Sequence, residues 1–345
     1  MTTVRARAFA KLNLGLRILG RRRDGYHELR SVLQTISLAD TLTLTFRPGR
    51  GVRLEAVRAA PGVCWPELAD GQNLAVRAAL LAREEFGLRG QIGVALHKRI
   101  PLGAGLGGGS ADAAAVLRVA AAQARRPPPA AALYRLAAAL GSDVPALLLG
   151  GTVLALGRGE ECYRLPDLPA WYCLLAAPAG VAVATAEAYA RWDRLHAGRS
   201  AGLTAEKNSV SINCLLGSLR RTYAVGSVRR AYVGGSRKRA APASRPRRDR
   251  GPAQAEPRVR AGIENDFHEA VFPLSPDFLS IRRALGRAGA VWVSLSGSGA
   301  AQYGLFTSRA AAEAARAVLP ASAHAWTARF VRPRDEFCDW GVVQR

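Results

Sequence analysis

Alternation of apolar and polar residues is the first pattern along the chain. Between residues 5 and 16, every second position is apolar, namely Ala6, Ala8, Ala10, Leu12, Leu14 and Leu16. Because successive side chains of a β-strand point to opposite faces, this period of two predicts a strand. Lys11 and Asn13 then share the other face with Phe9 and lie roughly 7 Å apart. A lysine in this apolar setting is a candidate functional residue, the alternative being a solvent-facing charge.

Later segments change between strand and helix patterns. Further strands are predicted at residues 29–38, 41–46, 92–99, 151–155, 174–177 and 291–295. Helices are predicted at residues 73–86, 111–124 and 130–140. Asn73 is a candidate N-cap, and a turn is expected at Ala39 and Asp40. The mixed order of helices and strands indicates an α+β fold.

Length and charge suggest two domains and one unusual segment. A chain of 345 residues suits two domains of ordinary size, with a boundary expected near residues 160–170. The net charge is +23, and residues 217–262 hold thirteen Lys and Arg but two acidic residues. Four prolines and little apolar periodicity in this basic block predict a flexible, solvated insertion.

Three interpretations of the basic block stay open: a patch for RNA or an acidic surface, a tolerated surface loop, or a sequence error. An RNA-binding platform needs stacking side chains, and the block offers only Tyr223 and Tyr232. Binding of nucleic acid is therefore not expected to be the main role of the chain.

Cysteine usage and hydropathy bear on the compartment. The five cysteines are scattered and form no CxxC pair, which argues against a disulfide framework and a cysteine zinc site. Basic residues interrupt the first apolar stretch, unlike a signal peptide. The uncharged run at 171–186 is too short to span a bilayer. We therefore expect a protein of the cytoplasm without a membrane anchor, whose oligomeric state the sequence does not predict.

A glycine-rich loop between a predicted strand and a predicted helix carries the clearest chemistry. Residues 101–110 read PLGAGLGGGS, and glycines let backbone N–H groups approach an anion closely. A helix start adds unpaired N–H donors and the positive end of the helix dipole. The pattern predicts a phosphate-binding loop, with Ser110 as a hydroxyl donor, an N-cap or both.

Two familiar nucleotide loops do not fit this segment. A dinucleotide site needs an acidic residue about 20 positions after the glycines, and none occurs between Asp112 and Asp143. The loop also lacks the GK[ST] of a Walker motif. Charge must come from elsewhere, and Lys11 and Asp143 are the candidates. A carboxylate can accept the proton of an alcohol in phosphoryl transfer, although Asp143 could equally cap a turn.

The loop and a second glycine motif resemble the GHMP kinases. PLGAGLGGGSADAA is similar to the second motif of that family, and SLSGSGAA at 294–301 resembles its third, which braces the phosphate loop. Within the family, the blocks at 10–42, 72–82, 140–160, 185–193 and 265–272 resemble the branch that phosphorylates a diphosphocytidyl derivative of methylerythritol.

The resemblance implies a fold and a reaction. The fold would be the two-domain GHMP kinase fold: residues 1–165 like domain 2 of ribosomal protein S5, and residues 166–345 ferredoxin-like, interrupted by the basic block. The reaction would transfer the γ-phosphoryl group of ATP to the 2-hydroxyl of a small-molecule substrate. Mg²⁺ is expected with ATP, although no metal ligand is assigned.

The resemblance also implies roles for single residues. Lys11 and Asp143 match the catalytic pair of the family. Asn13 matches a substrate-side position, Tyr26 and His27 match positions that hold cytosine, and Tyr189 matches an aromatic residue that covers the base from the other side. The expected ATP-binding residues are Asn73, Lys98, Pro101, Leu102, Gly103, Ala104, Gly105, Leu106, Gly107, Gly108, Gly109, Ser110 and Ala111.

One departure and one rival bear on these expectations. Ala111 replaces the second of two consecutive hydroxyl residues that relatives often have, while Ser110 is retained. Another small-molecule kinase of the same family is the main rival. Tyr26, His27 and Tyr189 discriminate, because a cytosine-type ligand needs these rings.

Overall fold

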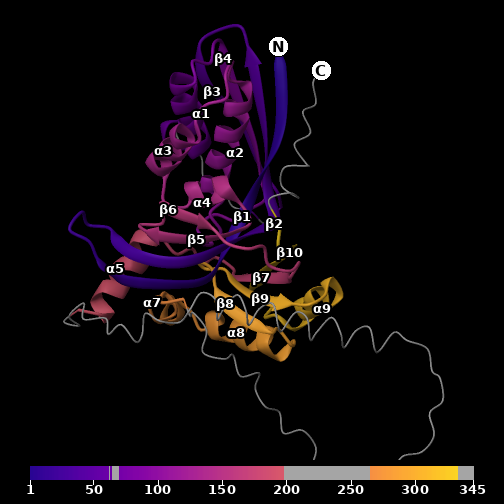
Figure 1. The fold of residues 1–345 in the computed structure, drawn as a ribbon. Coiled ribbons are helices and arrows are strands. Elements are labelled where there is room, and N and C mark those ends of the chain that lie inside the picture. Colours follow the sequence, from indigo (N-terminus) through magenta and orange to yellow (C-terminus); the bar gives the residue numbers. More distant parts are fainter. Residues whose placement is uncertain (62, 64–69, 198–264, 333–345) are drawn as a thin grey trace, which may run out of the picture.

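Two long antiparallel strands form the spine of the molecule. In the computed structural model, which describes residues 1–61, 63, 70–197 and 265–332, β1 (Thr2–Arg21) pairs with β2 (His27–Arg47) along most of its length. Figure 1 shows this ribbon descending from the N-terminus and then curving toward α5 (Thr185–Leu195). Lys11, near the middle of β1, therefore lies between the N-terminal part of the fold and the part that contains α5.

The first sheet has the strand order β3-β4-β2-β5-β6, with β1 paired to β2 outside this path. Its other strands are β3 (Gly51–Ala59), β4 (Gln91–Lys98), β5 (Thr152–Gly157) and β6 (Glu161–Arg164). Its helices are α1 (Leu74–Glu85), α2 (Gly108–Gln123), α3 (Ala130–Leu140) and α4 (Val144–Leu149). Small alanine side chains let α2 pack closely against both α1 and β1.

The second sheet has the strand order β10-β7-β9-β8. Its strands are β7 (Tyr172–Pro178), β8 (Trp292–Leu295), β9 (Gln302–Phe306) and β10 (Ala323–Arg329). Besides α5, the helices of this part are α7 (His268–Val271), α8 (Asp277–Arg287) and α9 (Arg309–Ala314), with 3-10 turns at η2 (Phe272–Leu274) and η3 (Ala315–Val318). Figure 1 shows α8 below the sheet and α9 at its right-hand side. The fold is α+β, as predicted.

β2 runs unbroken through Ala39 and Asp40, so the predicted turn there is wrong. The pairing with β1 instead shifts register between Phe9 and Lys11, which is a bulge. Asp40 is fully buried, and its carboxylate accepts a hydrogen bond of 2.8 Å from the backbone N–H of Ile100. Aspartate is uncommon in strands, and here its carboxylate binds the backbone of the segment that follows β4.

The helix starts differ in how well the sequence predicted them. α1 is preceded by a 3-10 turn, η1 (Asp70–Gln72). Asn73 is its N-cap, as predicted: its Oδ1 accepts a 2.9 Å hydrogen bond from the N–H of Ala75. α2 begins at Gly108, earlier than predicted, and its N-cap is Gly107 rather than Ser110. Glycine has low helix propensity, so the apolar pattern hid this first turn.

The chain passes from the first sheet to the second between Arg164 and Tyr172. This change of sheet lies beside the predicted domain boundary, while the domains 1–165 and 166–345 themselves stay a prediction. Contacts across the boundary are specific: Leu16 bridges to Asn265, and Arg17 Nη1 lies 2.7 Å from Asp266 Oδ1. The two halves are therefore joined near the C-terminal end of β1.

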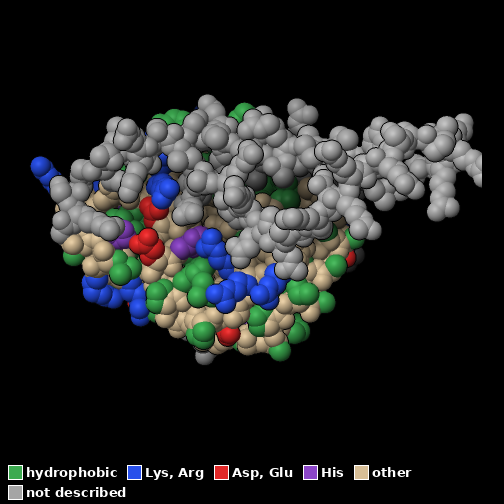
Figure 2. Space-filling model, turned by 90° about the horizontal axis from the view of Figure 1, so that it is seen from below, with side chains coloured by type: hydrophobic (Ala, Val, Ile, Leu, Met, Phe, Trp, Pro, Cys, Tyr) green, Lys and Arg blue, Asp and Glu red, His purple; other side chains and the backbone are tan. Residues whose placement is uncertain are grey.

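The basic block at 217–262 lies outside the described residues. Figure 2, seen from below, shows Lys and Arg side chains interspersed with hydrophobic ones on the part of that face free of grey atoms. Within the described ranges, no helix has both the length and the apolar character that a bilayer span requires. The cysteines described there, Cys162 and Cys173, are free thiols.

Candidate active site

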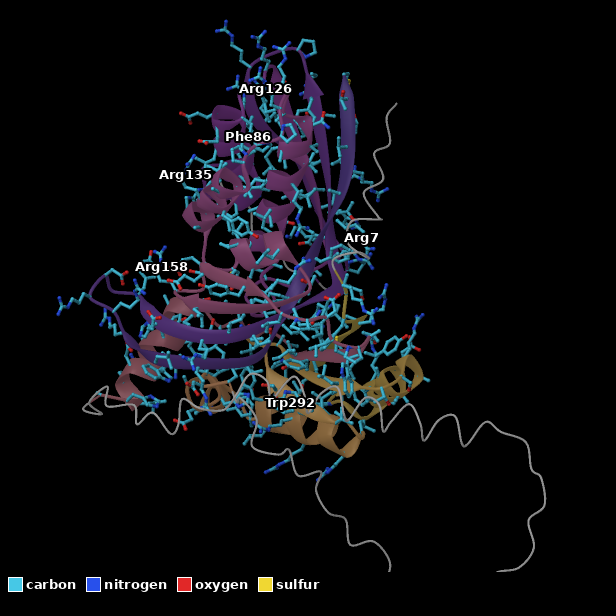
Figure 3. The ribbon with its side chains drawn as sticks, viewed as in Figure 1. Arg7, Phe86, Arg126, Arg135, Arg158 and Trp292 are labelled. Atoms are coloured by element: carbon cyan, nitrogen blue, oxygen red, sulfur yellow. The ribbon has the colours of Figure 1, made fainter. Side chains whose placement is uncertain are left out.

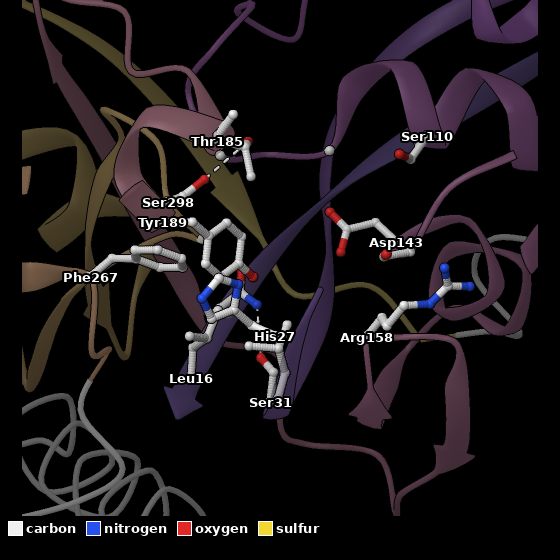
Figure 4. A pocket seen from close by; sticks show the side chains of 18 of the residues that line it. Leu16, His27, Ser31, Ser110, Asp143, Arg158, Thr185, Tyr189, Phe267 and Ser298 are labelled. Carbon is white, nitrogen blue, oxygen red and sulfur yellow. Dashed lines mark hydrogen bonds between the residues drawn. The ribbon is translucent and has the colours of Figure 1, made fainter. Parts of the chain in front are cut away.

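A cavity of about 740 Å³ opens where the two halves of the chain meet. Figure 4 shows Ser110 and Asp143 on one side of it and His27, Tyr189 and Phe267 on the other. The residues predicted from the sequence that line this cavity are Lys11, Asn13, Tyr26, His27, Leu102, Gly103, Gly105, Gly107, Gly108, Gly109, Ser110, Asp143 and Tyr189.

Lys11 and Asp143 meet inside this cavity although they are far apart in sequence. Lys11 Nζ lies 3.4 Å from Asp143 Oδ2, and the side chains are 5% and 37% exposed. The same ammonium donates a 2.7 Å hydrogen bond to Asn13 Oδ1. Because the ammonium is largely shielded from water, its charge acts strongly on the carboxylate and on any anion nearby.

A chain of hydrogen bonds orients the ammonium. Asn13 Nδ2 donates to Ser31 Oγ at 2.8 Å, and that hydroxyl donates to the carbonyl of Gly15 at 2.8 Å. The backbone N–H of Lys11 donates to the carbonyl of Leu106 at 3.0 Å, which ties β1 to the glycine loop. Asn13 therefore lines the cavity and also positions Lys11.

Asp143 stands at the N-cap position of α4, yet its side chain makes no capping hydrogen bond. The alternative that this aspartate merely caps a turn is therefore wrong. Its backbone carbonyl accepts the first helical bond, from the N–H of Leu147 at 3.1 Å. The backbone thus fixes the residue, while the carboxylate is left to face Lys11.

Residues 101–111 form the phosphate loop. At three positions the backbone of this loop has a conformation that favours glycine. Gly103, Gly105 and Gly107 have φ of 67°, 74° and 72°, in the left-handed region. A Cβ on Gly105 would lie 2.0 Å from the carbonyl oxygen of Ser296. Ser296 Oγ also donates to the carbonyl of Gly105 at 3.0 Å. The second glycine motif therefore packs directly on the phosphate loop, backbone against backbone.

The end of the phosphate loop presents hydrogen-bond donors to the cavity. α2 starts at Gly108, and the first N–H groups of a helix have no partner within it. Gly108, Gly109 and Ser110 all line the cavity, so these donors and the Ser110 hydroxyl lie together at the positive end of the helix dipole. An anion such as a phosphate fits this position.

Four residues of the loop do not line the cavity, contrary to the prediction that the whole segment binds ATP. They are Pro101, Ala104, Leu106 and Ala111. The last three are only 3%, 1% and 2% exposed, because they pack into the main hydrophobic core. Their side chains support the loop from inside the protein.

An aromatic cluster forms the other end of the cavity. The rings of His27 and Tyr189 stack with centroids 4.4 Å apart and planes inclined by 16°. His27 Nε2 lies 2.7 Å from Asp193 Oδ1, and Phe267 meets Tyr189 edge-on at 4.8 Å. Burial raises the pKa of the Tyr189 hydroxyl. Because the two rings touch, no base lies between His27 and Tyr189 in this arrangement.

Tyr26 lies apart from this stack. Its side chain is 53% exposed, and the guanidinium of Arg158 lies 4.6 Å from the centroid of its ring. Arg158 belongs to the turn between β5 and β6, on the same side of the molecule as α5 (Figure 3). Tyr26 and Arg158 both line the cavity, so a cation–π pair forms part of its wall.

Asn73 and Lys98, both expected to contact ATP, lie away from the cavity wall. Asn73 is 4% exposed and its Oδ1 is used as the cap of α1, although its neighbour Leu74 does line the cavity. Lys98 is fully buried, and its ammonium donates to the carboxylates of Asp40 and Asp112. Direct contact of Lys98 with a nucleotide is therefore contradicted.

Sequence reasoning missed several residues of the site. Ser31 and Arg158 lie within the recognised blocks 10–42 and 140–160, but neither was singled out, because the residues that they contact come from other elements of the fold. Asp193 lies within the recognised block 185–193, but only Tyr189 was singled out there. Thr185, in the same block, accepts a 3.1 Å hydrogen bond from Ser298 Oγ, which Figure 4 marks with a dashed line.

Models of known protein families match both parts of the chain. The model described as GHMP kinases N terminal domain matches residues 73–151, and that described as GHMP kinases C terminal matches residues 256–325. The first match contains the phosphate loop and Asp143. The second contains the glycine motif at 294–301.

Similar proteins extend over nearly the whole chain. A 4-diphosphocytidyl-2-C-methyl-D-erythritol kinase of Solibacter usitatus is 40% identical over 303 residues, or 88% of this chain and 81% of the relative. One of Gloeobacter violaceus is 37% identical over 321 residues, or 92% and 91%.

Solved structures agree with these relatives. A crystal structure of 4-(cytidine 5'-diphospho)-2C-methyl-D-erythritol kinase covers 95% of this chain and 100% of its own, with a TM-score of 0.65 and 31% identity. A homoserine kinase from Cytophaga hutchinsonii, with a TM-score of 0.64 and 20% identity, shares the fold. The chain has the GHMP kinase fold, and it belongs to the family of 4-diphosphocytidyl-2-C-methyl-D-erythritol kinases.

Proposed function

We propose that this chain transfers the γ-phosphoryl group of ATP to the 2-hydroxyl of 4-diphosphocytidyl-2-C-methyl-D-erythritol, giving the 2-phosphate and ADP. This reaction is a step of the non-mevalonate pathway to isoprenoid precursors. The observation that carries the proposal is the Lys11–Asp143 pair, 3.4 Å apart, in a cavity that reaches from the phosphate loop to an aromatic cluster.

The pair supplies the acid–base chemistry of the transfer. Asp143 accepts the proton of the attacking 2-hydroxyl, because its carboxylate is 37% exposed in the cavity and makes no capping bond. Lys11, 3.4 Å from that carboxylate, orients it and stabilises negative charge that develops on the transferred group. Asn13 holds the ammonium in place through its 2.7 Å hydrogen bond.

The phosphate loop binds the triphosphate of ATP. Gly108, Gly109 and Ser110 line the cavity at the start of α2, where their N–H groups and the Ser110 hydroxyl would hydrogen-bond phosphate oxygens. The loss of a second hydroxyl at Ala111 removes no group from the cavity, because Ala111 is 2% exposed.

Mg²⁺ is part of the proposal, and the residues fit a metal held mostly by the nucleotide. Among the described residues, no group of three or more His, Cys, Asp or Glu forms a metal site. Mg²⁺ commonly binds substrate phosphates with one or two carboxylates and several waters. The phosphates of the nucleotide and water would hold the ion beside the phosphate loop, and the ion would neutralise charge on the phosphates.

The aromatic cluster recognises the cytidine part of the substrate. A flat base stacks on the exposed ring of Tyr26 or on the outer faces of the His27–Tyr189 stack. The imidazole of His27, held by Asp193 at 2.7 Å, can hydrogen-bond the edge of the base.

The free thiols of Cys162 and Cys173 suit the reducing cytoplasm in which we place this reaction.

The test is formation of ADP from ATP in the presence of Mg²⁺ and 4-diphosphocytidyl-2-C-methyl-D-erythritol. Folded protein that forms no ADP above background contradicts the proposal. Competition by CMP discriminates against another small-molecule kinase of the family. Because the aromatic cluster would bind the cytosine ring, CMP should raise the apparent KM of the substrate, and a rival substrate without cytosine should not be displaced.

A further inference from the structure

Three charged side chains that the proposed reaction does not use are buried together. Lys98 at the end of β4 and Asp40 of β2 are fully buried, and Asp112 of α2 is 2% exposed. The ammonium donates to Oδ2 of both carboxylates. Taking charges out of water is costly, and a buried ion pair rarely stabilises a fold more than apolar residues would. This Lys98 cluster therefore calls for an explanation other than stability.

The cluster contacts both ends of the phosphate loop. Asp40 Oδ1 accepts hydrogen bonds from the N–H groups of Arg99 and Ile100, the two residues directly before the loop, the second at 2.8 Å. Asp112 follows the loop directly, in the first turns of α2. A Cβ on Gly108 would lie 3.1 Å from the side chain of Ile100 and 3.7 Å from Asp40 Oδ2. The start of α2 thus packs onto the cluster.

The phosphate loop needs such support because its own backbone is permissive. Glycines at 103, 105 and 107 lie in the left-handed region, and glycine restricts the backbone less than any other residue. On one side, the loop is held by Ser296 and by the N–H of Ala301, which donates to the carbonyl of Ala104 at 3.1 Å. These bonds fix the middle of the loop and leave its two ends to other contacts.

We propose that Lys98, Asp40 and Asp112 are positioning residues, which hold the two ends of the phosphate loop in the conformation that receives the phosphates of ATP. This inference rests on the proposed function of the loop. Lys98 is the bridge, because its single ammonium joins the strand that precedes the loop, Asp40 of β2 and the helix that follows. It acts on the nucleotide only through the loop.

The charge state of the cluster agrees with this role. Burial raises the pKa of the Asp112 carboxyl to about 7, although Lys98 opposes the shift. Burial alone would lower the pKa of Lys98, but the two carboxylates raise it, so the ammonium stays charged. Asp112 Oδ1 has no hydrogen-bond partner in the described part of the chain. With a proton on Asp112 the cluster is neutral, and it does not repel the phosphates bound nearby.

The test compares Lys98→Met with Asp112→Asn in the full chain. Lys98→Met removes the bridge and leaves two carboxylates facing each other. We expect the KM for ATP and the dissociation constant of Mg²⁺-ADP, measured by calorimetry, to rise about 10- to 100-fold, while the KM of the diphosphocytidyl substrate stays within about twofold. Asp112→Asn keeps an oxygen that accepts from Lys98, so it should raise the KM for ATP less than Lys98→Met does.

A second variant and a control separate positioning from stability. Asp40→Asn turns an amide NH₂ toward the ammonium while Oδ1 still accepts from the backbone, so it should raise the KM for ATP as Lys98→Met does. It replaces Lys98→Met in the test if Lys98→Met fails to fold. Leu136→Ala leaves a cavity in α3, away from the loop, and should lower Tm without changing either KM.

Two outcomes overturn the proposal: an unchanged affinity for Mg²⁺-ADP in folded Lys98→Met or Asp40→Asn, or an equal rise of both KM values. Failure of the proposed function can be told apart from failure of this inference. In the first case the wild-type protein forms no ADP, but calorimetric binding of Mg²⁺-ADP to wild type and variants still measures whether Lys98 positions the loop.

Discussion

The imidazole of His27 and the phenol ring of Tyr189 lie face to face, with centroids 4.4 Å apart and planes inclined by 16°. His27 begins β2 and Tyr189 lies on α5, so the stack joins the two halves of the chain. A base between two rings would hold them about 7 Å apart, twice the van der Waals contact distance of ~3.5 Å. If the cluster binds cytosine as proposed, we expect the base to stack on an outer face of the pair or its entry to separate α5 from β2.

Replacement of Tyr189 tests its place in substrate binding. Tyr189→Leu removes a ring whose stacking on a base is worth about 1–3 kcal/mol, so the KM of the diphosphocytidyl substrate should rise about 5- to 100-fold. The KM for ATP should stay unchanged, because the phosphate loop lies at the other end of the cavity. Tyr189→Phe keeps the ring and is the control. Steady-state kinetics with an unaltered KM for the leucine variant would remove Tyr189 from the binding site.

Replacement of Asp143 tests the proposed base. Asp143→Asn keeps the shape of the side chain but removes the proton acceptor that faces Lys11 at 3.4 Å. We expect kcat to fall by about 10²- to 10⁴-fold, the usual contribution of general base catalysis. Calorimetric binding of Mg²⁺-ADP should change little, because the loop donors are intact. A variant that turns over at the wild-type rate would show that another group accepts the proton.

Local periodicity predicted the parts of the fold that depend on neighbours in sequence. The alternation at 5–16 placed Lys11 and Asn13 on one face, and the structure joins them by a 2.7 Å hydrogen bond. The helix at 130–140 matches α3 residue for residue. The period predicts the buried face of α3, whereas residues 8–16 of β1 are buried on both faces, because the strand also packs against the phosphate loop and the second half of the chain.

Residues whose role depends on distant partners were misread. Lys98 was expected to bind ATP, but its carboxylate partners lie 58 and 14 residues away and draw it into the interior. Asp40 suggested a turn because aspartate is common in turns. Its carboxylate instead binds the backbone N–H of Ile100, 60 residues later, which no local pattern indicates. Arg158 had no pattern at all, since only the folded turn brings it over Tyr26. Pairings of this kind arise from tertiary structure, which a period cannot encode.

Arg158 should contribute to recognition of the charged substrate. Its guanidinium lies 4.6 Å from the ring centroid of Tyr26 in the cavity wall, where the diphosphate of the substrate needs cations. Arg158→Gln should raise the KM of the diphosphocytidyl substrate about tenfold, as expected for one charge-assisted hydrogen bond.

Competition by CMP and CDP locates that effect on the molecule. If Arg158 binds the second phosphate, CDP should inhibit wild type more strongly than CMP, and the difference should shrink in Arg158→Gln. Arg53→Gln, which removes an exposed charge on β3, is the matched control and should keep the difference. An equal CDP-to-CMP ratio in wild type and Arg158→Gln would show that Arg158 contacts Tyr26 and Glu160 but not the substrate phosphates.

Asp112 should make the stability of the protein depend on pH. Burial raises the pKa of its carboxyl from 3.8 to about 7, so between these values the folded state binds more protons than the unfolded state. Stability from this group is therefore complete below pH 4 and is lost as the pH rises through 7. The full difference is on the order of 4 kcal/mol.

The variant Asp112→Asn removes this ionisation and keeps the acceptor for Lys98. Urea unfolding at pH 5 and at pH 8 should show its stability relative to wild type increasing with pH, because only wild type must bury the second carboxylate. Glu313→Gln, at an exposed position of α9, is the control and should follow wild type at both values. A stability difference between Asp112→Asn and wild type that is the same at pH 5 and pH 8 would mean that Asp112 is ionised in the folded protein throughout this range, with Lys98 fully compensating its burial.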